Sequence, residues 1–235
     1  MVHRELELTP PLFEVGPKAY LFGADAVDLA VRADALSREY NVQVIFDPQY
    51  VDIPLIAQRV QRLLVFAQHM DGIPPGRGQG SVLPEAVKAA GAVGVVLNHV
   101  EHRLSPWQLE TTIRRAKEVG LATMVCADGT EQAVSVAALH PDVIVVESPE
   151  LIGAGGGHDT DPQAIAATNQ AIWRVDPRIR VLRGAGIGDA HDVYEVIAAG
   201  AQGTGSSSAI CNAADPMSML EAMIRAVREA WDLTH

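Results

Sequence analysis

The chain has few cysteines and no long apolar run. Its 235 residues include two cysteines, Cys126 and Cys211, without C-x-x-C spacing, so neither a disulfide framework nor a cysteine-based metal site is indicated. No uninterrupted apolar stretch approaches the roughly 18 residues that a membrane span requires. Residues 1–11 carry charges and lack the apolar centre of a signal peptide. We therefore expect a cytoplasmic protein with two reduced thiols and no membrane partner.

Basic residues are also scarce. Lysine and arginine total 18 against 29 aspartates and glutamates, which gives a net charge of −11. A nucleic-acid partner is not expected, because binding a phosphate backbone needs a basic surface. A phosphorylated small molecule remains compatible with this charge, since backbone N–H groups and one lysine can hold a single phosphate locally.

Short β-branched runs alternate with helical periodicity along the whole sequence. Most of the runs are continuously apolar, as strands covered on both faces are. We expect strands at Leu12–Lys18, Val42–Asp47, Leu63–Gln68, Gly94–Asn98, Ala122–Ala127, Val143–Glu147, Arg180–Gly184 and Gly203–Ser206. We expect helices at Ala24–Tyr40, Tyr50–Arg59, Leu83–Ala90, Ser105–Val119, Thr130–Leu139, Pro162–Val175, Asp189–Ala199 and Pro216–Trp231. Eight such units without a composition break predict an α/β fold, a single (β/α)8 barrel domain over residues 1–235.

An open, doubly wound sheet is the alternative fold, but it usually has fewer strands and a glycine-rich first βα turn, which this sequence lacks. In a closed barrel, functional side chains gather at the carboxyl ends of the strands. The residues at or just beyond those ends are Lys18, Gln68, His99, Glu147, Gly186, Ser207 and Ser208.

Glu147 ends the apolar run 143–146 and precedes a glycine-rich stretch, residues 153–157. A carboxylate that leaves a buried strand has a raised pKa, which suits a general base near neutral pH. The stretch after it could close as a lid over a bound anion. A helix-capping glutamate beside a flexible loop would give the same pattern.

His99 and Lys18 follow two other strands. A histidine in such a place can polarise a carbonyl, and a lysine can balance a phosphate or a developing negative charge. A rim histidine and a solvated lysine are the alternatives. No H-x-H or H-x-x-x-H pair indicates a metal site.

Two glycine-containing segments, residues 184–186 and 203–208, follow the last two strands. Barrels commonly build a phosphate site there from backbone N–H groups. One such segment is weak evidence, whereas two at these strands favour a phosphorylated ligand.

Taken together, these motifs closely resemble the archaeal-type triosephosphate isomerases, and the resemblance runs through nearly the whole chain in unbroken order. The segments that carry it are Asp47–Ile56, Ala67–Asp71, Leu83–Lys88, Leu97–His99, Glu147–Gly153 and Gly184–Ile187. The resemblance implies a TIM barrel that interconverts glyceraldehyde 3-phosphate and dihydroxyacetone phosphate through an enediolate. It implies no metal or organic cofactor, and a homodimer or homotetramer.

The resemblance also implies roles for individual residues. Glu147 aligns with the proton-shuttling base, His99 with a neutral electrophile, and Lys18 with the lysine that binds phosphate and stabilises the transition state. Glu150 aligns with a second glutamate and is not the base. The positions whose backbones would hold the phosphate are Ile152, Gly186, Ser207 and Ser208.

Three positions depart from the family pattern. Gly16 and Pro17 stand where the family has asparagine and phenylalanine, and Val100 replaces the serine after the histidine. We expect Gly16 to leave an unfilled space beside the substrate, which makes isomerisation of a four-carbon ketose phosphate the alternative within this chemistry. A Schiff-base aldolase or lyase with Lys18 as nucleophile is a second class, and a non-catalytic phosphosugar-binding homologue is a third.

Overall fold

Eight short parallel strands close into a barrel in the computed structural model, which describes residues 6–147 and 161–235. Each strand pairs with its neighbours in chain order, and β1 also pairs with β8, so that the sheet has no free edge. The strands are β1 (Leu12–Val15), β2 (Gln43–Phe46), β3 (Leu64–Ala67), β4 (Gly94–Leu97), β5 (Ala122–Ala127), β6 (Val143–Val146), β7 (Arg180–Arg183) and β8 (Gly203–Ser206). The predicted (β/α)8 barrel is confirmed.

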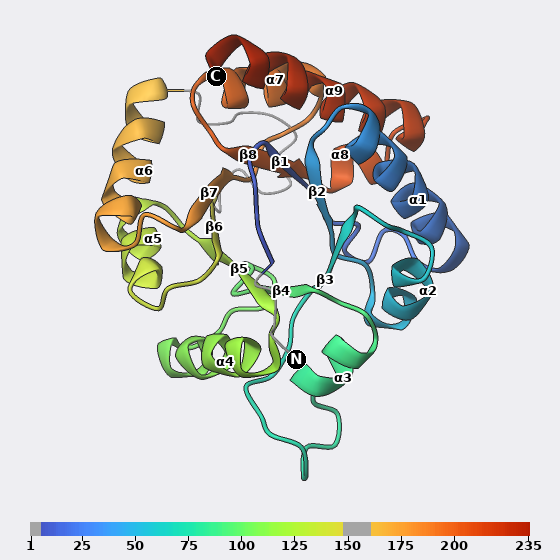
Figure 1. Ribbon diagram of the computed structural model, residues 1–235, viewed down its shortest axis with the longest axis vertical. Coiled ribbons are helices and arrows are strands. Elements are labelled where there is room, and N and C mark those ends of the chain that lie inside the picture. The colour runs from blue at the N-terminus through green and yellow to red at the C-terminus, as the bar shows by residue number, and fades with distance from the viewer. Residues whose placement is uncertain (1–5, 148–160) are drawn as a thin grey trace.

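Helices surround the ring of strands, as Figure 1 shows. They are α1 (Gly23–Glu39), α2 (Ile53–Ala57), α3 (Pro84–Ala89), α4 (Pro106–Val119), α5 (Thr130–Ala137), α6 (Pro162–Val175), α7 (Ala190–Ala198), α8 (Ser208–Cys211) and α9 (Pro216–Thr234). A short 3-10 helix (Tyr50–Asp52) precedes α2. Local signals explain several helix starts: Ser105 forms a capping box with Gln108 at the start of α4, and Gly120 ends that helix in the left-handed conformation.

Side chains alternate between two apolar layers along each strand. Leu12 packs inside the barrel with Ile45 and Phe66, whereas Phe13 and Val15 pack outward against the helices. This alternation follows from the two-residue period of a strand. It also decides which residue reaches the mouth of the barrel, because the next inward position after Leu12 is Glu14 and the next after Ile45 is Asp47.

Most expected element bounds differ from the observed ones by one to three residues, and three differences are informative. β1 ends at Val15 rather than Lys18, because the chain turns sharply and Lys18 takes a φ of 48°. The helix expected over Tyr50–Arg59 is divided into a 3-10 turn and α2. The four-residue helix α8 was not expected, since Ser208–Cys211 is too short to show periodicity.

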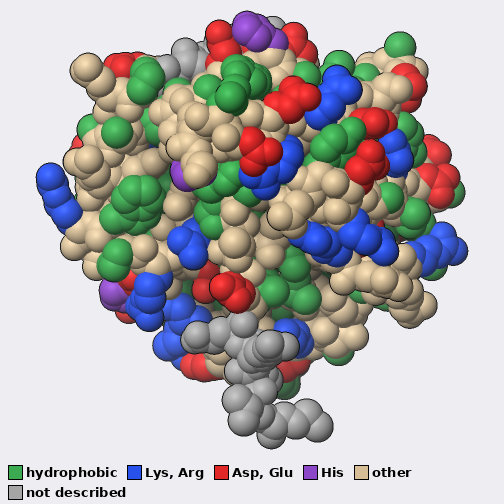
Figure 2. Space-filling model, turned by 45° about the horizontal axis from the view of Figure 1, so that its top comes forward, with side chains coloured by type: hydrophobic (Ala, Val, Ile, Leu, Met, Phe, Trp, Pro, Cys, Tyr) green, Lys and Arg blue, Asp and Glu red, His purple; other side chains and the backbone are tan. Residues whose placement is uncertain are grey.

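The surface carries both signs of charge. On the face in Figure 2, lysine and arginine side chains lie interspersed with aspartate and glutamate, and no field of one charge covers that face. Within the described part of the chain, no helix is both long and apolar enough to cross a membrane.

Candidate active site

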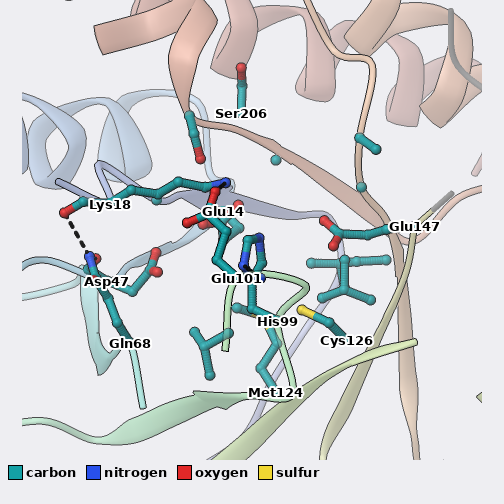
Figure 3. Close-up of a pocket in the computed structure, with 18 of the residues that line it drawn as sticks. Glu14, Lys18, Asp47, Gln68, His99, Glu101, Met124, Cys126, Glu147 and Ser206 are labelled. Atoms are coloured by element: carbon teal, nitrogen blue, oxygen red, sulfur yellow. Dashed lines mark hydrogen bonds and ion pairs between the residues drawn. The ribbon is translucent and has the colours of Figure 1, made fainter. Parts of the chain in front are cut away.

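A pocket of about 370 Å³ opens at the carboxyl ends of the strands, where a barrel places its functional groups. Lys18, Asp47 and Gln68 lie on one side of it and Glu147 and Cys126 on the other, as Figure 3 shows. The predicted site residues that line the pocket are Lys18, His99, Glu147, Gly186, Ser207 and Ser208. Ile152, the remaining predicted site residue, lies outside the described residues.

Lys18 is held by its own backbone. Its carbonyl oxygen accepts hydrogen bonds from Nε2 of Gln49 at 2.7 Å and Nε2 of Gln68 at 3.1 Å, while its φ is 48°. A non-glycine residue in this left-handed region is strained and persists only where its surroundings fix it. The Nζ atom lies 3.0 Å from Oε1 of Glu101, in a partly exposed ion pair. The lysine head is therefore fixed over the pocket from both ends.

His99 is positioned by the residues on either side of it. Asn98, with a φ of 60°, donates from Nδ2 to the carbonyl of Cys126 and accepts from the backbone N–H of Leu104, which ties the end of β4 to its loop. The ring Nδ1 of His99 accepts a hydrogen bond from the backbone N–H of Glu101 at 3.1 Å. Nδ1 is then unprotonated, and the single ring proton is on Nε2.

The electrostatics agree with a neutral imidazole. Burial and the positive charge of Lys18 lower the pKa of His99 to about 4. The ring is uncharged at neutral pH and can donate from Nε2 to a carbonyl oxygen without losing a full proton.

Glu147 continues the inward-facing positions of β6. Its backbone N–H donates to the carbonyl of Ala127 at 2.9 Å, and its carboxyl lies against Gly184 of the neighbouring strand end. Burial and the nearby charge of Glu14 raise the pKa of Glu147 to about 7. A carboxylate with that pKa is half ionised at neutral pH, which suits reversible proton transfer.

Two backbone positions in the pocket, after β7 and after β8, offer N–H groups to an anion. Ala185 and Gly186 have consecutive positive φ values of 65° and 75°, so the chain after β7 bends toward the pocket. Ser207 and Ser208 follow β8, and Ser208 opens α8. Among the described residues, the N–H groups of Gly186 and Ser207 have no hydrogen-bond acceptor. They are available to a phosphate.

Two more carboxyls, which were not predicted as site residues from the sequence, also line the pocket. Glu14 lies on β1, and Asp47 immediately follows β2. Burial raises the pKa of both groups, and the charge of Glu14 raises that of Asp47 further. The two-residue alternation after Leu12 and Ile45 is the signal in the sequence that could have revealed them. Glu101, two residues after His99, was likewise missed.

The expected empty space beside Gly16 is wrong. A Cβ placed on Gly16 would lie only 2.4 Å from Oε1 of Glu14 and 3.2 Å from Oδ1 of Asp47. The volume that a larger side chain would take is filled by the Glu14 carboxyl. Gly16 thus makes room for the Glu14 carboxyl, which lines the pocket at this point in place of a larger side chain at position 16.

Among the described residues, no group of three or more histidine, cysteine, aspartate or glutamate side chains is arranged to hold a metal ion. Cys126 and Cys211 are both free thiols. The polar groups of the pocket include a carboxyl with a pKa of about 7, an uncharged imidazole, an ammonium group and backbone N–H groups. That set suits proton transfer on an anionic ligand.

Comparison with known proteins agrees with this geometry. The family model of triosephosphate isomerase matches residues 18–226. The triosephosphate isomerases of Methanosarcina barkeri and Saccharolobus solfataricus are 37% and 35% identical to the chain, over 92% and 95% of its length and 99% of each relative. That of Methanobacterium bryantii is 38% identical over 89% of the chain and 94% of the relative. The chain therefore belongs to the triosephosphate isomerase family.

Proposed function

We propose that the protein is an aldose–ketose isomerase of a short phosphorylated sugar, with glyceraldehyde 3-phosphate and dihydroxyacetone phosphate as the reference pair. Membership of the family makes its activity triosephosphate isomerase-like, an intramolecular oxidoreduction. One observation carries the proposal. A single pocket holds a carboxyl whose pKa is about 7, a histidine whose pKa is about 4, and the ammonium group of a lysine.

In the proposed reaction, Glu147 removes a proton from the carbon next to the substrate carbonyl. His99 donates a hydrogen bond from Nε2 to the carbonyl oxygen, so that the electron pair moves onto that oxygen and an enediolate forms. Glu147 then returns the proton to the neighbouring carbon, and the hydroxyl proton moves to the former carbonyl oxygen, which His99 contacts, so that the hydroxyl carbon becomes the new carbonyl. Atoms and electrons balance within the substrate, and the steps above use neither a metal nor an organic cofactor.

The phosphate is proposed to bind opposite the base. Lys18 contributes charge, and the free backbone amides of Gly186 and Ser207 contribute hydrogen bonds, with Ser208 beside them. Ile152 is assigned to this group by the family resemblance. Charge-assisted hydrogen bonds from several fixed donors can hold one phosphate even though the protein is strongly acidic.

The Schiff-base alternative has less support. A lysine nucleophile needs a neutral nitrogen that is free to attack, whereas Nζ of Lys18 is in an ion pair with Glu101. Borohydride treatment in the presence of substrate should therefore leave no adduct on Lys18. A non-catalytic phosphosugar binder would have no use for a carboxyl whose pKa is near neutrality.

The decisive experiment measures isomerisation of three- to five-carbon aldose and ketose phosphates in D2O. We expect deuterium to enter the carbon next to the carbonyl as turnover proceeds. The same measurement on Glu147→Gln tests the role of Glu147. Loss of deuterium exchange with retained binding of 2-phosphoglycolate supports the isomerase, and unchanged exchange rejects Glu147 as the base.

We also propose a homodimer or homotetramer, in the cytoplasm, of chains that each form one domain over residues 1–235. Phe22, the N-cap residue of α1, and Val51, in the 3-10 helix after β2, are 70% and 83% exposed. Large apolar side chains exposed near a site are typical of a surface that another subunit covers. Light scattering of the purified protein, compared with a Val51→Lys variant, tests this assembly.

A further inference from the structure

The Glu14 and Asp47 side chains transfer no proton in the proposed isomerase chemistry, although the charge of Glu14 helps to raise the pKa of Glu147, and both side chains face the substrate pocket. They come from adjacent strands: the register of β1 and β2 pairs Glu14 with Ile45, so Asp47 occupies the next inward position toward the pocket end, diagonal to Glu14. Each lies within hydrogen-bonding range of the other. Burying two adjacent carboxyls in a barrel interior costs free energy unless hydrogen bonds or charges compensate them.

The chain makes room for Glu14 with two glycines. A Cβ on Gly16 would lie 2.4 Å from Oε1 of Glu14, and a Cβ on Gly205 would lie 2.2 Å from its Oε2. The Glu14 carboxyl thus lies between Gly16 and Gly205, and a larger residue at position 16 or 205 would displace it. Its orientation toward Asp47 is fixed by backbone rather than by flexible side chains.

Oxygen atoms converge on the space beside Gly16. The ideal Cβ position there is within 3.2 Å of Oε1 of Glu14, Oδ1 of Asp47 and Oγ of Ser207. Asp47 is only 7% exposed, and its buried Oδ1 has no donor from another described residue beyond the proton that it can share with Glu14. A carboxyl pair has more acceptor positions than one shared proton can satisfy, so the oxygens that border the pocket can accept a hydrogen bond from a ligand.

The charges of these groups favour a neutral donor as that ligand group. Burial raises the pKa of Glu14, and burial with the charge of Glu14 raises the pKa of Asp47 well above its usual range, which favours one proton shared by the pair. Lys18 offsets the remaining negative charge. The pair then needs no second cation, but its oxygens can still accept a hydrogen bond from a hydroxyl.

We propose that Glu14 and Asp47 form a hydroxyl-binding subsite, and that the preferred substrate is a sugar phosphate with one more hydroxyl-bearing carbon than a triose phosphate. The extra hydroxyl donates to the carboxyl pair while Glu147 and His99 act on the neighbouring carbons. This inference rests on the proposed isomerase function. It makes Glu14 and Asp47 specificity-determining residues.

The test compares kcat/KM for four-carbon ketose and aldose phosphates with that for the triose phosphates. Glu14→Leu removes the acceptor and should lower kcat/KM for the four-carbon substrates roughly 10- to 100-fold more than kcat/KM for the triose phosphates, which is the effect of losing a charge-assisted hydrogen bond. Glu14→Gln and Asp47→Asn keep shape and should give intermediate losses. Because Glu14 also affects Glu147, the ratio of the two kcat/KM values is the readout, and it cancels changes common to both substrates.

The matched control is Asp34→Asn. Asp34 is a buried carboxylate remote from the pocket, whose Oδ1 accepts the backbone N–H groups of residues 61–63. Its replacement should lower stability without changing the substrate ratio. If Glu14→Leu does not fold, the two isosteric variants carry the test.

A second readout does not depend on turnover. Calorimetry should show tighter binding of 4-phosphoerythronate than of 2-phosphoglycolate by the wild type, and loss of that preference in Glu14→Leu. A wild type inert on every sugar phosphate would overturn the isomerase function, and selective binding of the longer acid would still support the subsite. The hydroxyl subsite would be overturned, and the isomerase function kept, if the wild type had its highest kcat/KM on triose phosphates and the Glu14 and Asp47 variants changed kcat/KM for three- and four-carbon substrates by the same factor.

Discussion

Replacing Gly184 with alanine tests whether the placement of Glu147 governs turnover. Gly184 lies directly after β7, and its φ is not in the left-handed region, so the backbone tolerates alanine. A Cβ there would lie 2.2 Å from Oε1, 2.7 Å from Cγ and 2.8 Å from Cδ of Glu147. Since relaxed contacts are about 3.5 Å, the carboxyl must retreat by about 1 Å.

A displacement of about 1 Å in a reacting group lowers the rate roughly 100-fold, which corresponds to about 2.7 kcal/mol of barrier. We expect kcat for Gly184→Ala to fall by that factor. Binding of 2-phosphoglycolate should stay within a few-fold, because the phosphate amides are on other residues. Overpacking lowers stability by about 1–3 kcal/mol, so assays must be run well below the unfolding temperature.

Gly188→Ala is the matched control, in the same loop. Its Cβ would meet only Oδ2 of Asp192, at 3.2 Å, a side-chain atom that can shift. That variant should retain kcat within about twofold. A Gly184→Ala enzyme with wild-type kcat would show that Glu147 is not the base, or that the base does not need this position, and the reasoning from the pocket geometry would fail.

Three further predictions concern the base, its titration and the scaffold. Glu147→Gln keeps shape but removes the base, so kcat in an isomerisation assay should fall about 10²–10⁴-fold; near-normal turnover would direct the search to Glu150. The ionised Glu147 carboxylate is the active form, so log kcat/KM should rise with pH and level off above about 7. Glu14→Gln removes a negative neighbour and should move the rising part of this profile to lower pH. A profile that does not move would contradict the coupling between Glu14 and Glu147. Ser105→Ala removes the cap of α4 and should cost about 1 kcal/mol, seen as a fall of roughly 2–4 °C in Tm with unchanged turnover.

The barrel was predictable because its signals are local and repeated. Apolar runs such as residues 143–146, and cap signals such as Ser105 at the start of α4, mark strand and helix positions without reference to the rest of the chain. Eight repeats of one unit allow few arrangements. The bounds were less accurate wherever the chain turns for a site: β1 ends early because Lys18 is held in a strained conformation by contacts with Gln49 and Gln68.

The candidate site was predictable in part. Lys18, His99 and Glu147 follow strands and therefore had to gather at one end of the barrel. Glu101 could not be chosen among many exposed acids, because its ion pair with Lys18 joins residues 83 positions apart in the sequence. Glu14 was overlooked because it lies within a strand, where an acid usually indicates a solvent-facing position.

Gly16 shows why a departure from a family pattern has to be interpreted in three dimensions. Along the sequence, a glycine in place of asparagine looks like a lost contact and an added volume. In the fold, the same position adjoins Glu14 and Asp47, and the carboxyl of Glu14 fills the volume. An asparagine at this position would have to expel that carboxyl. Gly16, Glu14 and Gly205 therefore form one structural unit. We expect that a larger side chain at position 16 or 205 can be accommodated only when Glu14 is replaced as well.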